Sequence, residues 1–109
     1  FLVNGCIDHN YVLKGNSIDK VIAYIYSKIT GMGVEYSTDQ PGIQFYTGNM
    51  MNESYNGKHN RNYGLQYGMC LETQIFPDAI NQPDFPSTIL KKGETYSSNT
   101  KIKLRNDFI

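Results

Sequence analysis

Apolar residues along the chain fall into short runs that are separated by clusters of Gly, Pro, Asn and Ser. The runs are rich in Val, Ile, Tyr and Phe, and several alternate with polar residues, which is typical of β-strands. The pattern predicts strands over residues 11–14, 20–28, 34–38, 43–47, 69–74 and 95–105. No segment of useful length repeats its apolar residues with the helical period of 3.6, so we expect no helix. Short strands at regular turn spacing favour an all-β fold, an antiparallel β-sandwich.

The run at residues 69–74 contains a single carboxylate, Glu72. Successive side chains of a strand point to opposite faces, so Cys70 and Glu72 share one face and Leu71 takes the other. The apolar start of the run predicts a buried strand. A carboxylate that faces an apolar interior carries a large desolvation cost unless it is hydrogen-bonded or has a chemical task. Glu72 is therefore the first candidate for a functional residue.

The segment that follows, residues 75–86, has prolines at positions 77, 83 and 86 and no regular pattern. Proline fixes φ and removes a backbone donor, so we expect a stiff, ordered loop. A rigid loop directly after the strand that carries Glu72 suggests the wall of a pocket. Residues 50–67 are rich in Asn, Gly and Tyr and are expected to form a long surface loop.

Composition and charge restrict the classes of function. The 109 residues suit one small domain, with a hydrophobic fraction of 39% and a formal net charge of zero. A neutral chain gives no electrostatic argument for binding nucleic acid or an anionic membrane surface, and no apolar run is long enough for a membrane-spanning helix. Two cysteines, Cys6 and Cys70, are too few for a disulfide framework or a metal site and favour free thiols in the cytoplasm. The chain begins with Phe1 and shows no signal-peptide pattern, so we interpret it as the middle of a longer protein.

Three longer motifs carry a family resemblance. Residues 8–13 read Asp-His-Asn-Tyr-Val-Leu, residues 40–49 read Gln-Pro-Gly-Ile-Gln-Phe-Tyr-Thr-Gly-Asn, and residues 71–86 contain Leu-Glu-Thr-Gln, Phe-Pro-Asp and Asn-Gln-Pro-Asp-Phe-Pro. Together they make nearly the whole chain similar to the aldose 1-epimerases (galactose mutarotases), which have a large β-sandwich fold. The resemblance is to the C-terminal part of the family only. We therefore expect residues 1–109 to be the C-terminal portion of such a domain.

The resemblance implies an isomerase that interconverts the α and β anomers of hexoses such as galactose and glucose. In this family the Glu of the Leu-Glu-Thr-Gln motif, Glu72 here, is the general base that takes the proton from the C1 hydroxyl. Asp8, in the first motif, is expected to accept hydrogen bonds from ring hydroxyls, and Gln44, in the second, to contact the sugar. Ring opening and reclosure need a positioned acid and base but no metal, so no cofactor is implied. The acid histidine of the family is expected upstream, in the N-terminal remainder of the same protein.

Each of the three site residues also has a structural interpretation. Glu72 could be paired with a Lys or held by backbone amides, Asp8 could be a turn residue, and Gln44 could form a cross-strand amide pair. His9 does not match the histidine motifs of the family and is interpreted as structural, and His59 is interpreted as solvated.

Two other functions stay open on the sequence alone. A relative acting on hexose 6-phosphates would need cationic residues around the pocket. A non-catalytic carbohydrate-binding domain of the same fold would have lost its chemistry, and an intact Glu72 argues against that alternative.

Overall fold

The regular structure of the chain consists of six strands and two single-turn helices, seen in a computed structural model that describes residues 5–54 and 56–107. The expectation of a longer protein rests partly on Phe1, which lies outside the described residues. Tyr55, in the predicted 50–67 loop, also lies outside them. The elements are β1 (Asp8–Val12), β2 (Ala23–Tyr26), β3 (Gly33–Thr38), β4 (Gly42–Tyr46), the 3-10 helix η1 (Lys58–Asn60), β5 (Cys70–Gln74), the 3-10 helix η2 (Ala79–Asn81) and β6 (Thr100–Arg105). This composition confirms the all-β prediction. Within the described ranges, no helix has the length and apolar character needed to cross a membrane.

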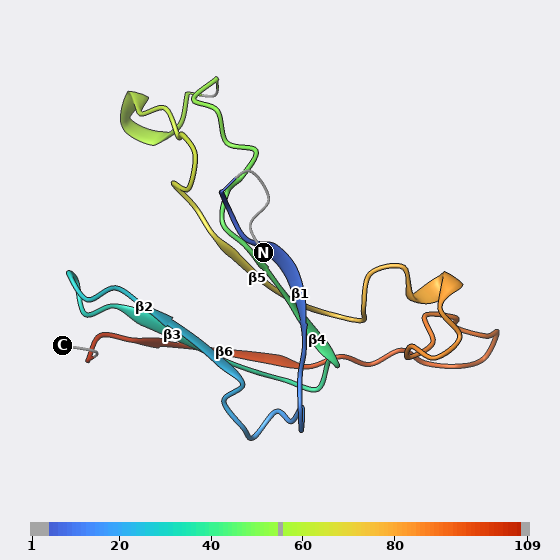
Figure 1. Cartoon of the computed structure of the whole chain (residues 1–109). Coiled ribbons are helices and arrows are strands. Elements are labelled where there is room, and N and C mark those ends of the chain that lie inside the picture. Colours follow the sequence, from blue (N-terminus) through green and yellow to red (C-terminus); the bar gives the residue numbers. More distant parts are fainter. Residues whose placement is uncertain (1–4, 55, 108–109) are drawn as a thin grey trace.

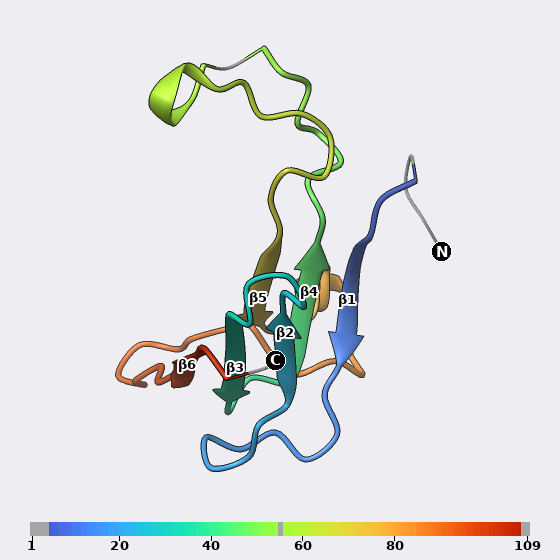
Figure 2. The same ribbon diagram turned by 90° about the vertical axis from the view of Figure 1, so that its left-hand side faces the viewer.

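The strands form two antiparallel sheets, with the orders β1-β4-β5 and β2-β3-β6 (Figure 1). Most of the pairing joins strands that are distant in sequence, because β4 lies between β1 and β5, and β3 lies between β2 and β6. Residues 47–54 and 56–69 project from one end of β4 and β5, and residues 75–99 leave from the opposite end (Figure 2).

The β2–β3 hairpin is the one pairing that follows from local sequence. Its strands are β-branched and aromatic, and its turn is closed by backbone hydrogen bonds from the Ser27 amide to the Met32 carbonyl (2.8 Å) and from the Gly31 amide to the Ser27 carbonyl (2.9 Å). Gly31 has a φ of 69°, in the left-handed region that a residue without a Cβ adopts at little cost. The predicted hairpin is therefore confirmed, but its first strand covers only Ala23–Tyr26 of the predicted residues 20–28.

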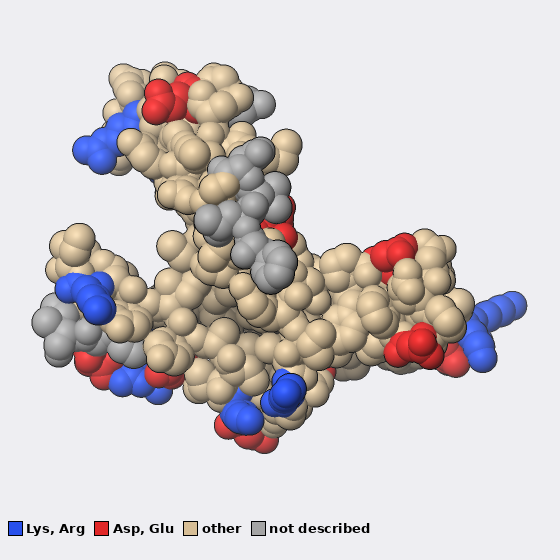
Figure 3. Space-filling model, in the orientation of Figure 1, with Lys and Arg blue, Asp and Glu red and all other residues tan. Residues whose placement is uncertain are grey.

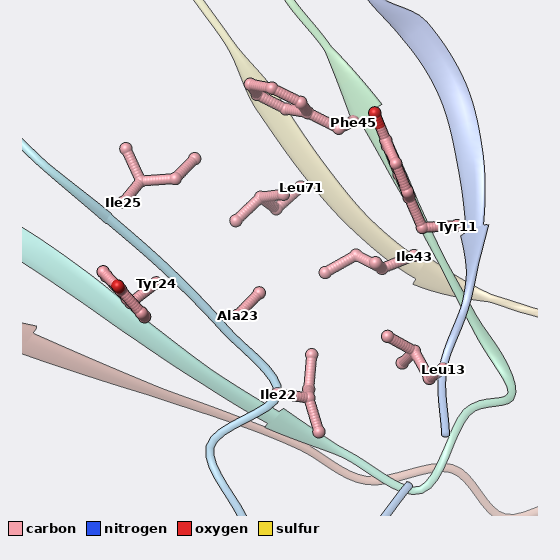
Figure 4. A pocket seen from close by; sticks show the side chains of 9 residues that line it. All are labelled: Tyr11, Leu13, Ile22, Ala23, Tyr24, Ile25, Ile43, Phe45 and Leu71. Atoms are coloured by element: carbon pink, nitrogen blue, oxygen red, sulfur yellow. The ribbon is translucent and has the colours of Figure 1, made fainter. Parts of the chain in front are cut away.

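The two sheets meet through their apolar faces at β2. Side chains from both sheets converge on a hollow of about 300 Å³, and Ile43, which lines it, is only 4% exposed. The lining residues are Tyr11, Leu13, Ile22, Ala23, Tyr24, Ile25, Ile43, Phe45 and Leu71 (Figure 4). Farther along the second sheet the same face is open, because Ile102 and Leu104 are 56% and 72% exposed. The radius of gyration, 16.7 Å, accordingly exceeds the roughly 13 Å of a compact domain of this length.

A chain of hydroxyl groups joins the two sheets at the corner between β3 and β4. The hydroxyl of the fully buried Thr38 is 3.0 Å from that of Thr100, which is in turn 2.7 Å from that of Thr73 in β5. Next to it, the carboxylate of Asp39 accepts hydrogen bonds from the backbone and side-chain amides of Asn99, and these bonds lower the pKa of Asp39. These hydrogen bonds hold the start of β4 in place relative to β5 and β6.

Three expectations about the strands are corrected by these pairings. The first strand begins at Asp8 rather than at residue 11, because Asp8 already pairs with Tyr46. The last begins at Thr100 rather than at residue 95, because Thr100 is the first residue to pair with β3. The predicted burial of the strand at 69–74 is wrong: β5 is an edge strand of the sheet that the described residues form, and both Cys70 and Glu72 are exposed.

Candidate functional site

Three neighbouring strands bring the candidate residues onto one face of the β1-β4-β5 sheet. Asn10, Gln44 and Glu72 are directly opposite one another in the register, and Asp8 lies two residues before Asn10. Residues that are directly opposite, or two positions apart along a strand, share a face of the sheet. Asp8, Gln44 and Glu72 therefore lie together, although they come from three separate sequence motifs. We refer to this surface as the polar face.

A hydrogen bond already joins two of the predicted site residues. The Nε2 of Gln44 donates to the Oδ1 of Asp8 at 2.7 Å. An ionised carboxylate only accepts hydrogen bonds, so this contact fixes which end of the Gln44 amide faces Asp8. Asp8 is the first residue of β1 and is exposed, which does not agree with a turn or capping role. The cross-strand pairing considered for Gln44 is thus present, with a carboxylate as its partner.

Glu72 presents an exposed carboxylate on the polar face. Within residues 5–54 and 56–107, the Glu72 side chain forms neither a hydrogen bond nor an ion pair. The two salt bridges among these residues are formed by Arg105, with Glu35 and with Asp107. The structural alternative, a Lys partner or backbone amides, therefore finds no support in the described residues. The expectation that Glu72 faces an apolar interior is wrong, because strand alternation turns Leu71, and not Glu72, toward the other sheet.

Side chains of the loop after β5 contact one another. The rings of Phe76 and Phe85 pack edge to face at 5.2 Å. Asp78 adopts a left-handed conformation with a φ of 61°, and its carboxylate accepts hydrogen bonds from the side-chain amides of Gln82 (2.8 Å) and Asn81. Both bonds favour the ionised form and lower the pKa of Asp78. The loop so held begins directly after the strand that carries Glu72.

The apolar hollow between the sheets is a different place from the polar face. Its side chains are aliphatic or aromatic, and the hydroxyls of Tyr11 and Tyr24 are their only polar groups (Figure 4). Ile43 and Phe45 line it, which confirms that Gln44, between them, points the other way. A sugar needs several polar partners for its hydroxyls, so the hollow is sandwich interior and not the candidate site. In the space-filling view, Lys and Arg lie at the periphery of the molecule (Figure 3).

Neither histidine is placed on the polar face. His9 pairs with Phe45, on the face opposite to Asn10 and Gln44, and its Nδ1 accepts a hydrogen bond from the Asp8 backbone amide at 3.2 Å. His59 is exposed in η1, with a φ of 58°. Over the described ranges, no group of three or more His, Cys, Asp or Glu side chains could hold a metal ion.

Sequence reasoning missed two residues of this face, Asn10 and Gly42. Asn10 follows Asp8 by two positions, so the strand period of two would have predicted a shared face. Gly42 is buried at the start of β4, and a Cβ built there would lie 2.8 Å from the Oδ1 of Asn10 and 3.0 Å from a ring carbon of Phe76. A glycine in a strand often marks such a close approach, and this signal was also available.

Known proteins resemble this chain over nearly its whole length. The sequence profile of the family "Aldose 1-epimerase" matches residues 2–103. Galactose mutarotase from Bos taurus is 46% identical over 103 residues, and that from Homo sapiens is 44% identical over 103 residues. Each alignment includes 94% of this chain and 30% of the relative. Aldose 1-epimerase from Escherichia coli (strain K12) is 33% identical over 100 residues, or 88% of this chain and 28% of the relative.

A solved structure supports the same grouping at the level of the fold. The GalM/aldose epimerase homologue from C. elegans superimposes with a TM-score of 0.84 at 20% sequence identity, over 94% of this chain and 30% of that chain. The chain thus spans about 30% of the length of the relatives it matches. The profile match and the level of identity show that the chain belongs to the aldose 1-epimerase family.

Proposed function

We propose that this chain is the C-terminal portion of an aldose 1-epimerase that interconverts the α and β anomers of hexoses such as galactose and glucose. The observation that carries the proposal is the placement of Glu72, an exposed carboxylate without a protein partner among the described residues, directly opposite Gln44. Gln44 is itself hydrogen-bonded to Asp8, so one face presents a free base beside a hydrogen-bonding pair.

The reaction explains why a single carboxylate can supply the base that mutarotation needs. Glu72 takes the proton from the C1 hydroxyl while an acid protonates the ring oxygen O5, and the C1–O5 bond breaks to give the open aldehyde. Rotation about the C1–C2 bond presents the other face of the aldehyde. The O5 hydroxyl then attacks C1 and loses its proton to the conjugate base of the acid, while Glu72 returns its proton to O1. A positioned acid or base contributes roughly 10²–10⁴-fold to such a proton transfer.

Asp8 and Gln44 suit the task of holding the sugar. A carboxylate can accept hydrogen bonds from two neighbouring hydroxyls, and such charge-assisted bonds are stronger than neutral ones. The bond from Gln44 to Asp8 holds both side chains in place before the sugar arrives, which reduces the entropy lost on binding.

We propose that the acid at O5 comes from outside the described residues. His9 lies on the opposite face of the sheet and His59 in a distant exposed turn. We infer that an upstream histidine in the N-terminal remainder of the same protein supplies the proton. The same remainder would cover the open apolar face at Ile102 and Leu104. The free thiols of Cys6 and Cys70 fit a reducing compartment, and we propose a cytoplasmic location.

The two alternative functions are less well supported. A hexose 6-phosphate would need a cationic partner, and the strands β1, β4 and β5 contain no Lys or Arg. An intact Glu72 opposite Gln44, without a partner among the described residues, argues against a binding domain that has lost its catalytic base.

Polarimetry on the full-length protein tests the proposal. Freshly dissolved α-galactose should reach its equilibrium rotation faster in proportion to enzyme concentration, and galactose 6-phosphate should show little acceleration. Binding of galactose without any acceleration would support the carbohydrate-binding domain instead, and preference for the phosphorylated sugar would support the second alternative.

A further inference from the structure

Two buried polar atoms on the polar face lack partners, and they belong to the same cross-strand pair. Asn10 and Gln44 are directly opposite in the β1–β4 register. The Nδ2 of Asn10 and the Oε1 of Gln44 are both buried, and neither has a hydrogen-bond partner among the described residues. One atom is a donor and the other an acceptor, and directly opposite residues in an antiparallel pair have Cβ atoms about 4.5–5.5 Å apart.

The orientation of the Gln44 amide leaves only one suitable donor opposite it. Its Nε2 is committed to Asp8, whose carboxylate can only accept, so its Oε1 must face elsewhere. The two side chains directly opposite Gln44 are Asn10 and Glu72. An ionised Glu72 cannot donate a hydrogen bond, whereas the Asn10 amide can. Because Oε1 is buried, a sugar hydroxyl in the open part of the face does not reach it.

Packing confines the Asn10 side chain on the polar face. The position of a Cβ on Gly42 would be 2.8 Å from its Oδ1 and 3.0 Å from its Nδ2, with a ring carbon of Phe76 at 3.0 Å. The Asn10 amide therefore lies against the backbone of Gly42 beside the Phe76 ring, two positions along β4 from Gln44.

We propose that Asn10 is a positioning residue for sugar binding, which donates a hydrogen bond from Nδ2 to the Oε1 of Gln44. The bond completes a row in which Asn10 holds Gln44 and Gln44 holds Asp8. The row keeps the Gln44 nitrogen and the Asp8 carboxylate directed at the sugar hydroxyls. Asn10 acts through Gln44 and does not touch the sugar. This inference rests on the proposed function, because it assigns Asn10 to the same hexose site.

Calorimetric titration of the full-length protein with galactose, combined with a double-mutant cycle, tests the coupling. Asn10→Ala should weaken affinity roughly 3- to 10-fold, the effect expected for one hydrogen bond, and should raise KM by more than it lowers kcat. In a Gln44→Ala background the same substitution should change affinity less than about 2-fold, because the group it acts through is gone. Asn16→Ala is the matched control, since it removes a side-chain amide bond to the Asp39 carbonyl, outside the polar face, and should leave affinity unchanged.

Asn10→Asp keeps the shape of the side chain and covers the case in which Asn10→Ala does not fold. It replaces the donor with an acceptor that faces Gln44 Oε1, so it should weaken affinity more than Asn10→Ala does. The inference would be overturned if Asn10→Asp left the affinity for galactose unchanged. It would also be overturned if Asn10→Ala weakened that affinity equally in the parent protein and in the Gln44→Ala background. The mutarotation rate of Glu72→Gln, measured in parallel, tests the proposed function separately from the role of Asn10. A normal rate in that variant contradicts the proposed function, whereas the binding cycle reports on Asn10 alone.

Discussion

Replacing Gly42 with Ala tests how tightly the polar face is packed. Gly42 does not have a positive φ, so its backbone accepts an alanine and only the added methyl group matters. That methyl would lie 2.8 Å from the Oδ1 of Asn10, 3.0 Å from its Nδ2 and 3.0 Å from a ring carbon of Phe76. The neighbours are side chains rather than backbone, so they can move, but Asn10 belongs to β1, which pairs with β4, and the Phe76 ring packs on that of Phe85.

The expected magnitude follows from two opposing effects. Overpacking at a buried position costs about 1–3 kcal/mol. Restricting the unfolded chain by Gly→Ala stabilises the protein by about 0.4–1 kcal/mol. The free energy of unfolding of Gly42→Ala should therefore fall by about 1–2 kcal/mol.

Urea titration of the full-length protein measures this change against a matched glycine. The Cβ of Gly68→Ala would have Met51 Sδ as its nearest neighbour at 3.6 Å, an ordinary contact, and Gly68 also lacks a positive φ. Gly68→Ala should thus be neutral or slightly stabilising. The double variant Asn10→Ala/Gly42→Ala should recover part of the loss, because the closest obstacle is gone. Equal stability of the two single glycine variants would refute the packing described for Asn10 and Phe76.

Two further predictions concern the carboxylates. Asp8→Asn should weaken galactose affinity more than Gln44→Ala in calorimetric titration, because a charge-assisted bond is worth about 1.5–3 kcal/mol against about 0.5–1.5 for a neutral one; equal losses would indicate structural roles. The hydrogen bond from the Asn99 backbone amide is the main cause of the lowered pKa of Asp39. The stability that Asp39 contributes is therefore fully present above its unfolded-state pKa of 3.8, and it is lost as the pH falls through its lower folded-state pKa. Asp39→Asn should therefore reduce the acid-induced loss of stability below that pH, and an unchanged acid limb in urea titrations would contradict the assigned bonds.

Local patterns were sufficient to predict part of the fold. The hairpin of β2 and β3 follows from two β-favouring runs and a glycine turn, all within one short stretch. The pairing of β6 with β3 and of β5 with β4 depends on contacts between distant segments, which no local pattern contains. For the same reason the start of β1 at Asp8 was missed, since it is defined by pairing with Tyr46.

The sequence predicted the orientation of some residues of the candidate site correctly and that of others incorrectly. Alternation correctly placed Gln44 opposite to the face of Ile43 and Phe45. It also separated Glu72 from Leu71, but the apolar run around them was taken to mean burial on both faces. β5 is an edge strand whose polar side carries no layer of described residues, so Glu72 is exposed. Asn10 was overlooked because the strand was predicted to begin at residue 11, so alternation was not applied to residues 8–10.

The central claim is that Glu72 is the base that opens the sugar ring. Glu72→Gln keeps the shape and hydrogen-bonding capacity of the side chain but removes its ability to take a proton. Polarimetry of the full-length variant with fresh α-galactose, beside calorimetric affinity for the same sugar, measures the claim directly. We expect mutarotation to slow by roughly 10²–10⁴-fold while the dissociation constant stays within a few-fold of the parent protein. A near-normal rate in Glu72→Gln would contradict the account.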